Sequence, residues 1–239
     1  MRSQPVTEEQ VTELMSICEN DRSDFSKRLA YFYLTGGESL ISLQESGEYE
    51  KALQVLPVAK KKQLEQMAEY VYKIWSDIVY FPIPLSSSNP QYTVSFENSW
   101  LFERTFGGVR GHEGTDIMAS ENTRGVYPVI SSSNGVVEQL GWLEKGGYRI
   151  GIRSENGAYF YYAHLESYAQ DIQKGDTVEA GQLLGFVGDT GYGSEGTTGK
   201  FPVHLHFGIY ISTAEQEELS VNPYPVLLYC KEKRLTFKY

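Results

Sequence analysis

Residues 159–164 read Tyr159-Phe160-Tyr161-Tyr162-Ala163-His164, and this run decides how the second half of the chain folds. It is rich in the aromatic residues that strands favour, and a second strand-like run occurs at Tyr148–Arg153. Glycine or polar turn residues follow both runs, and no amphipathic pattern long enough for a helix is evident between residues 92 and 210. The sequence therefore predicts a mainly antiparallel β domain over residues 92–239.

The first third of the chain has a helical pattern instead. Thr7 and Gln10 are spaced as a capping box, and the apolar residues that follow repeat at helical intervals. These repeats are Val11, Leu14, Met15 and Cys18, then Phe25, Leu29 and Phe32 before Gly36-Gly37, and, after Pro57, Leu64, Met67, Val71, Ile74 and Ile78. We expect an α+β protein with a small helical region at 1–81 and a linker at 82–91, where prolines and serines oppose both helix and sheet.

Composition narrows the classes of partner. The chain has 239 residues and a formal net charge of −10, which opposes binding to nucleic-acid phosphates. No apolar run approaches the ~20 residues that span a bilayer, and the first ten residues lack the apolar core of a signal peptide. The two cysteines, Cys18 and Cys230, form no CxxC pair; they are either a disulfide between the N-terminal region and a C-terminal strand or two buried thiols.

Two short segments carry residues suited to chemistry. In the strand-like segment His204-Leu205-His206-Phe207, alternate side chains point the same way, so both imidazoles share one face. In Gly111–Asp116, His112 and Asp116 are four residues apart, and we place them on a strand-to-turn segment where Gly114 lets the backbone bring both groups together. Either motif alone is more often a hydrogen-bonded structural pair. Both together, in a chain with four histidines, favour a site.

This set of residues suits zinc. Two imidazoles and one carboxylate make three protein ligands and leave a fourth position open, which is the arrangement of catalytic zinc sites. The remaining histidines suit the roles of general base, general acid or oxyanion stabiliser.

Three blocks in this order resemble the lysostaphin/LytM-type zinc endopeptidases, which cut peptide bonds in bacterial peptidoglycan. The blocks are Phe106–Ile117 (FGGVRGHEGTDI), Tyr162–Leu165 (YAHL) and His204–Gly208 (HLHFG), within a similarity that spans roughly residues 92–212. The resemblance implies a LytM-like two-sheet fold, a peptidoglycan peptide as substrate, and a location outside the cytoplasmic membrane, with any export or anchor segment outside this chain.

By position, the resemblance also implies the roles of the site residues. His112, Asp116 and His206 would bind Zn²⁺, while His164 and His204 would be the catalytic pair that orients water and stabilises the oxyanion.

The chain departs from the family pattern in two places. Phe106 stands where the family has a tyrosine that helps to stabilise the transition state, and Arg110, Tyr161 or Tyr162 are the candidates to replace it. The glycine-rich segment Gly188–Pro202 is also longer than the usual connection, which suggests a loop beside the cleft that selects substrates.

Three hypotheses follow. The first is a zinc endopeptidase of peptidoglycan, whose helical region either packs as a plain bundle or binds an envelope protein. The second is a catalytically silent scaffold in a cell-envelope complex, against which the complete set of expected ligands speaks. The third is a biotinyl- or lipoyl-type carrier, which residues 130–137 and 174–185 would suit. A carrier of this type would need a lysine at an exposed hairpin tip with the expected flanking residues, which the sequence lacks. The hypothesis also leaves the histidines unexplained.

Overall fold

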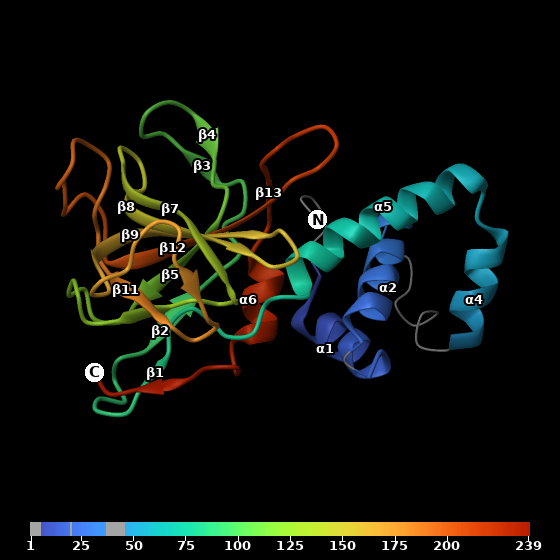
Figure 1. Ribbon diagram of the computed structural model, residues 1–239, viewed down its shortest axis with the longest axis horizontal. Helices are drawn as coiled ribbons and strands as arrows, with labels where there is room; N and C mark the ends of the chain where they lie inside the picture. Colours follow the sequence, from blue (N-terminus) through green and yellow to red (C-terminus); the bar gives the residue numbers. More distant parts are fainter. Residues whose placement is uncertain (1–5, 20, 37–45) are drawn as a thin grey trace. The chain divides into compact units, whose positions relative to one another are not determined.

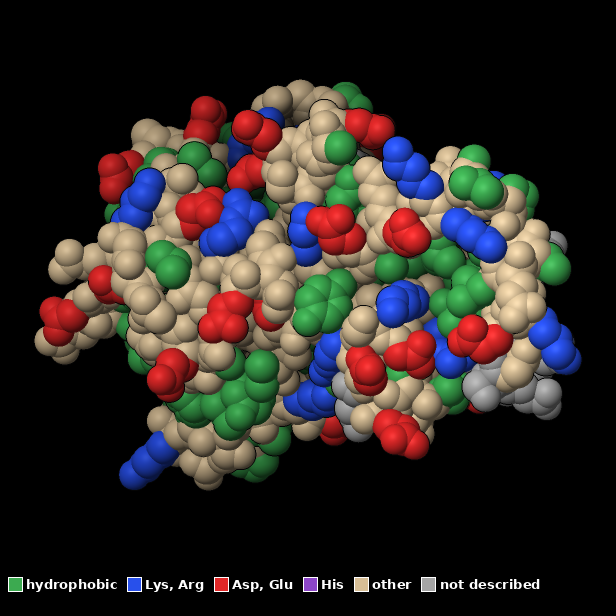
Figure 2. Space-filling view, turned by 45° about the vertical axis from the view of Figure 1, so that its right-hand side comes forward, with side chains coloured by type: hydrophobic (Ala, Val, Ile, Leu, Met, Phe, Trp, Pro, Cys, Tyr) green, Lys and Arg blue, Asp and Glu red, His purple; other side chains and the backbone are tan. Residues whose placement is uncertain are grey.

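The computed structural model describes residues 6–19, 21–36 and 46–239. The chain forms two compact units, Met1–Ser76 and Asp77–Tyr239 (Figure 1). Acidic side chains lie among basic ones over the face shown in Figure 2. No helix among the described residues combines the length and the apolar character that a membrane crossing requires.

The first unit is helical, as the sequence predicts. Its described helices are α1 (Glu8–Ile17), α2 (Arg22–Leu34), α4 (Ser46–Val55) and α5 (Val58–Trp75). The capping box is present: Thr7 Oγ1 accepts a hydrogen bond from the Gln10 backbone at 3.2 Å, and Gln10 Oε1 accepts one from the Thr7 backbone at 2.9 Å. Most residues of the predicted apolar stripes form the core of this unit, where α2 packs against α5 and the rings of Phe25 and Trp75 lie 5.2 Å apart. Of the third stripe, Met67 is only half-buried, and Ile78 lies beyond the end of α5 in the second unit.

The segment 82–91, which we expected to be a linker, belongs to the second unit. Strand β1 (Leu85–Ser86) pairs in parallel with β14 (Thr236–Phe237), and the side chains of Phe81 and Ile83 are at most 1% exposed. Prolines do oppose a helix here, but a short edge strand needs few backbone donors and tolerates them. The buried apolar side chains then attach the segment to the β unit.

Ten strands of the second unit form one sheet in which every pairing is antiparallel. The main order is β10-β7-β8-β9-β12-β5-β2, with β11 beside β9, β6 beside β11 and β13 beside β12. The strands are β2 (Val94–Phe96), β5 (Thr115–Ala119), β6 (Pro128–Ile130), β7 (Gly135–Leu143), β8 (Gly147–Ser154), β9 (Tyr159–Tyr168), β10 (Thr177–Val178), β11 (Leu183–Val187), β12 (His204–Ile211) and β13 (Leu219–Val221). This confirms the predicted α+β class with a mainly antiparallel domain.

Strand β9 joins the parts of this sheet through a bulge at His164. Its first half pairs with β12 and its last residues pair with β11, so the two sheets that we expected form one branched network. His164 has φ 63°, and the register with β8 shifts beside it. Tyr161 and His164 are three residues apart, which would place them on opposite faces of a regular strand. The bulge turns both toward the same cleft.

Two smaller elements complete the second unit. The hairpin β3 (Glu103–Arg104) and β4 (Arg110–Gly111) projects from the sheet (Figure 1). Helix α6 (Tyr224–Cys230) occupies the place where we expected a C-terminal strand. Cys230 is buried in this helix, and Cys18 is buried in the first unit; both are free thiols, which decides between the two alternatives of the sequence analysis.

Candidate active site

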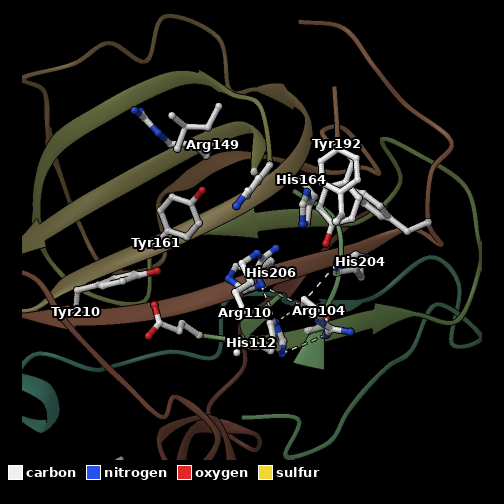
Figure 3. Close-up of a pocket in the computed structure, with 18 of the residues that line it drawn as sticks. Arg104, Arg110, His112, Arg149, Tyr161, His164, Tyr192, His204, His206 and Tyr210 are labelled. Atoms are coloured by element: carbon white, nitrogen blue, oxygen red, sulfur yellow. Dashed lines mark hydrogen bonds and ion pairs between the residues drawn. The ribbon is translucent and has the colours of Figure 1, made fainter. Parts of the chain in front are cut away.

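A cleft of about 1040 Å³ lies on one face of the sheet (Figure 3). The opposite face is the apolar core, because the alternate residues of β12 (Leu205, Phe207, Ile209 and Ile211) are fully buried. The floor of the cleft crosses five neighbouring strands, β7, β8, β9, β12 and β5. Its floor residues are Gln139, Arg149, Tyr159, Tyr161, His164, His204, His206, Tyr210 and Asp116.

Three side chains meet at one end of this cleft. His112 Nε2, His206 Nδ1 and Asp116 Oδ1 lie 3.0 Å from one another in each of the three pairings. Tetrahedral bonds of about 2.0–2.1 Å to zinc place neighbouring donor atoms about 3.3 Å apart, close to the separation seen here. Two imidazole nitrogens and one carboxylate oxygen that converge on one point therefore fit a zinc ion, with little further movement.

The register of the sheet creates this cluster. His206 on β12 lies directly opposite Asp116 on β5, and His112 precedes β5 by three residues. Gly114 is required for space: a Cβ there would lie 2.3 Å from the His206 ring. From the sequence we expected Gly114 to have a conformational role. The structure gives a steric reason instead, since the His206 ring packs directly against the Gly114 backbone.

Two residues that the sequence analysis missed hold the metal-site side chains in place. Ser99 Oγ lies 3.0 Å and Arg104 Nη2 lies 3.2 Å from His112 Nδ1, so both hold the ring by this nitrogen and turn Nε2 toward the cluster. Arg104 Nη2 donates to Asp116 Oδ2 at 2.6 Å, which leaves Oδ1 to face the two histidines. No motif marks either residue, and only their positions near the cluster in space reveal them.

Burial and neighbouring groups shift the pKa values at this end of the cleft. Burial alone would raise the pKa of Asp116, but hydrogen bonds from His112 and His206 outweigh it and hold that pKa well below its usual range. Burial lowers the pKa of His206, although Asp116 opposes this effect. The ionised carboxylate and the neutral imidazole are the charge states that metal binding needs, and a bound metal would replace the proton that His206 Nδ1 shares with Asp116.

The other two histidines lie at the side of the cleft next to this cluster. His164 Nδ1 lies 2.7 Å from the Thr190 carbonyl oxygen, and His204 Nδ1 lies 2.7 Å from the Pro202 carbonyl oxygen. A carbonyl only accepts hydrogen bonds, so each Nδ1 carries a proton and each Nε2 is left as an acceptor. Burial, together with the neighbouring imidazoles of His204 and His206, places the pKa of His164 well below its ordinary value.

Phe106 lies on the loop between β3 and β4, and its ring stacks on Tyr192 at 4.2 Å between centroids. Tyr192 lines the cleft beside His164 (Figure 3), with 6.1 Å between the two rings. Of the substitutes that we named, Tyr162 is fully buried and its hydroxyl accepts a hydrogen bond from the Ser132 backbone. Tyr161 does line the cleft. Tyr192 was not predicted as a site residue, because nothing local distinguishes it within the glycine-rich segment at 188–202.

The segment Gly188–Pro202 forms one wall of the cleft. It contributes Tyr192, and the ring of Phe201 from the connection to β12 lies 4.5 Å from His164 and 5.0 Å from His204. The carbonyl groups that orient both histidines belong to residues 190 and 202 of the same segment. The structure thus brings together all five residues named from the sequence, His112, Asp116, His164, His204 and His206.

Comparison with known proteins agrees with this geometry. Residues 110–223 match Peptidase family M23. The L-Ala–D-Glu endopeptidase of Bacillus subtilis (strain 168) is 47% identical over 147 residues, which are 62% of this chain and 42% of that protein. The glycyl-glycine endopeptidase ALE-1 of Staphylococcus capitis is 32% identical over 121 residues, which are 46% of this chain and 30% of that protein.

A solved structure agrees over a longer stretch. It comes from Ruminococcus gnavus ATCC 29149 and is presented as a candidate glycyl-glycine endopeptidase lytM; it is 47% identical, with a TM-score of 0.84, over 100% of this chain and 92% of that one. The chain spans less than half the length of the two curated relatives. With the full set of metal-site side chains in place, these similarities show that the chain belongs to peptidase family M23.

Proposed function

We propose that this protein is a zinc-dependent endopeptidase that hydrolyses peptide bonds in bacterial peptidoglycan. One observation carries the proposal: three metal-ligating atoms 3.0 Å apart lie beside two imidazoles that backbone carbonyls hold by Nδ1, in a cleft large enough for a peptide. A structural histidine cluster would not need a cleft of about 1040 Å³ in front of it.

In this proposal His112, Asp116 and His206 hold zinc. Zinc bound there lowers the pKa of a water ligand from about 15.7 toward about 7 and polarises the substrate carbonyl. The protein supplies the remaining functions. Ser99 and Arg104 orient two of the ligands, and the low pKa of Asp116 keeps its carboxylate ionised at neutral pH.

His204 is proposed as the general base and later the general acid. Its Nε2 lies 3.6 Å from Asp116 Oδ1, at the edge of the metal site, so it can take a proton from the attacking water. The protonated imidazole then returns this proton to the amine that leaves when the C–N bond breaks. The Pro202 carbonyl keeps the other nitrogen protonated, and so fixes which atom performs the transfer.

Tyr192 is proposed to donate a hydrogen bond to the oxyanion, and His164, whose Nε2 is an acceptor, to orient the attacking water. The rings of His164 and His204 lie 4.8 Å apart, which places both beside the same reacting group. Phe106 has no hydroxyl to donate, whereas its stacking partner Tyr192 has one and lines the cleft. The donor that the family has at position 106 would thus come from the opposite loop.

The setting of this activity is also a proposal. Peptidoglycan lies outside the cytoplasmic membrane, so an extracytoplasmic location follows from the proposed substrate. The helical unit contains a cleft of about 690 Å³ lined by α2, α4 and α5, and we suggest an envelope protein as the partner of that unit.

Two measurements test the function. Elemental analysis of the purified chain should find about one zinc per chain, and a chelator should abolish the hydrolysis of purified cell walls, with recovery when zinc is added. Mass analysis of the released peptides identifies the bond. A chain that binds zinc but releases no peptide from any cell wall would contradict the proposal and favour a silent scaffold.

A further inference from the structure

We propose that Arg110 and Arg149 form a carboxylate-binding subsite in the cleft. It follows that the preferred substrate carries a free carboxylate within one or two residues of the cleaved bond. This inference rests on the proposed peptidase function and specifies its substrate class: an acidic peptide rather than a bridge of glycines.

The sheet register places Arg149 in line with the metal site. Arg149 lies between the β8–β9 pairs Tyr148–Leu165 and Ile150–Tyr162, and so faces the bulge at residues 163–164. Ala163 in turn lies opposite His206. Neighbouring strands are about 4.8 Å apart, so the backbones of Arg149 and His206 are separated by about 10 Å across the sheet. An extended peptide of two to three residues covers this distance, and the long arginine side chain shortens it.

Arg110 approaches from the opposite side of the cleft. In the β3–β4 hairpin it lies directly opposite Arg104, and like charges in that arrangement destabilise a hairpin. Arg104 is neutralised by Asp116, but Arg110 forms no ion pair with any carboxylate of the described residues. Arg110 and Arg149 both line the cleft (Figure 3). The two arginines thus border the space into which a substrate at the metal site would extend.

Both arginines have hydrogen-bond donors without a partner. Arg110 Nε and Arg149 Nη1 are buried, and neither has an acceptor within the part of the chain that the structure describes. A buried guanidinium nitrogen is costly to leave unpaired, and a carboxylate is the group whose two oxygens match the guanidinium fork. The donors are therefore arranged for an anion that the protein itself does not provide.

The acidic residues of the cleft do not supply an acceptor for the unpaired donors of Arg110 and Arg149. Glu103 is exposed, so water solvates its carboxylate, and Glu218 lies 3.7 Å from Arg153. The chain as a whole has a net charge of −10, which repels anionic peptides at long range. A local pair of unneutralised arginines would therefore be needed to attract a carboxylate to this cleft.

This geometry favours a substrate with a free carboxylate next to the cleaved bond. A peptide cleaved at the amino group of glutamate is one example, because glutamate has two carboxyl groups, of which the next peptide bond uses at most one. At least one carboxylate then remains next to the cleaved bond. A bridge made of glycine alone has no such group, and would leave both guanidinium groups unpaired in the complex.

A pair of matched peptides tests the proposal. The first is a fluorescent L-alanyl-γ-D-glutamyl-L-lysine with its free α-carboxylate, and the second is its α-carboxamide twin, which has nearly the same shape and no charge. Binding of both is measured by anisotropy on the full, zinc-loaded chain carrying His204→Ala to prevent hydrolysis. Arg149→Gln and Arg110→Gln are then introduced, with Lys174→Gln as the control for the loss of one exposed positive charge.

We expect the carboxylate peptide to bind at least about tenfold more tightly than its twin, the effect of one charge-assisted hydrogen bond. Arg149→Gln and Arg110→Gln should each lower this ratio toward one, whereas Lys174→Gln should preserve it. Equal affinity for both peptides, or a ratio that both arginine variants leave unchanged, would overturn the subsite.

Hydrolysis by the chain with native His204 separates this inference from the proposed function. Zinc-dependent cleavage with no preference for the carboxylate would sink the subsite and leave the function standing. A binding preference that depends on the arginines, without cleavage of any cell-wall peptide, would support the subsite and contradict the function.

Discussion

The two ends of the histidine cluster are held in different ways. His112, Asp116 and His206 are oriented by side chains and by strand register: Ser99, Arg104 and the direct pairing of β5 with β12 fix their atoms. His164 and His204 are oriented by backbone carbonyls of the segment at residues 188–202 and are surrounded by aromatic rings. The metal end therefore belongs to the sheet, and the proton-transfer end depends on a loop.

The two ends of the cluster should therefore control different properties of the protein. A sheet register cannot shift by one residue without turning every side chain to the other face, so the metal site is strongly specified. A loop tolerates changes in length and sequence more easily. We expect metal affinity to respond to changes in the strands and hairpin, and rate and substrate choice to respond to changes in the loop.

The largest expected effect is that of Asp116→Asn, which removes the anionic ligand while it preserves the shape. Zinc content should fall to background, and wall hydrolysis should fall by more than the ~10²–10⁴-fold that a proton-transfer group contributes. Zinc is measured by elemental analysis and hydrolysis by peptide release, with the exposed Glu155→Gln as control. Full zinc occupancy in the variant would contradict the role of Asp116 as a metal ligand.

His164→Ala and His204→Ala should separate the two ends most clearly. Each should lower kcat by about 10²–10⁴-fold, because proton transfer or the orientation of the attacking water is lost. Zinc content should stay at the wild-type value, since neither side chain belongs to the cluster of three donors. If either variant also lost its zinc, the two ends would not be independent.

Arg104→Gln should weaken zinc binding by about 10–100-fold, the usual effect of losing a group that orients a metal ligand. The variant removes the donor 2.6 Å from Asp116 Oδ2 and so frees the carboxylate to rotate. Competition with a chromogenic chelator measures the affinity, and Lys174→Gln controls for the change in charge. Unchanged affinity would mean that strand pairing alone orients Asp116.

Tyr192→Phe should lower kcat by about tenfold, the contribution of one hydrogen bond, with zinc content unchanged. The ring and its stacking on Phe106 remain, so only the hydroxyl is removed. Adding Phe106→Tyr to this variant should restore part of the rate, because it returns a hydroxyl to the stacked pair of rings. Full activity of the single variant would assign the donor elsewhere, with Tyr161 as the next residue to test.

The smallest expected effect is on stability in acid. Burial lowers the pKa of His164 in the folded chain below the ~6.5 of the unfolded chain, so the unfolded chain binds more protons between these values. The free energy of unfolding of the metal-free protein should therefore be constant above about pH 6.5. It should fall by at most about 1.4 kcal/mol per pH unit below that value for this group.

Urea titrations of chelator-treated protein at pH 7.5 and 5.5 measure this difference. His164→Gln should show a smaller loss on acidification than the wild type. The loss should not disappear, because burial lowers the pKa of His206 in the same direction. An equal loss in both proteins would show that His164 does not contribute.

The sequence was sufficient to predict features that follow from strand alternation and from the chemistry of neighbouring residues. His204 and His206 share one face, as the HxH pattern predicts, and Leu205 and Phe207 are buried on the other. The resemblance placed His112 and His164 in the same cleft as this strand, and the structure brings them there. The helical stripes and the capping box are also present as predicted.

Other features depend on residues far apart in the chain. Arg104 meets Asp116, and Phe106 meets Tyr192, only because the β3–β4 hairpin folds over the sheet. The residues near 82–91 were expected to link two domains, yet they pair with the last strand of the chain. The local composition of a segment indicates which secondary structures it disfavours. The element with which the segment pairs depends on buried side chains elsewhere in the chain.

From the sequence alone, local patterns predicted the class of fold and the shared face of His204 and His206, because strand periodicity is a local property, and the family resemblance supplied the roles of the five site residues. The tertiary structure alone decided the atoms that each residue presents, the steric need for Gly114 and the alignment of Arg149 with His206. These depend on strand register, on a bulge at His164 and on hydrogen bonds across more than ten residues, and no local pattern encodes such distances.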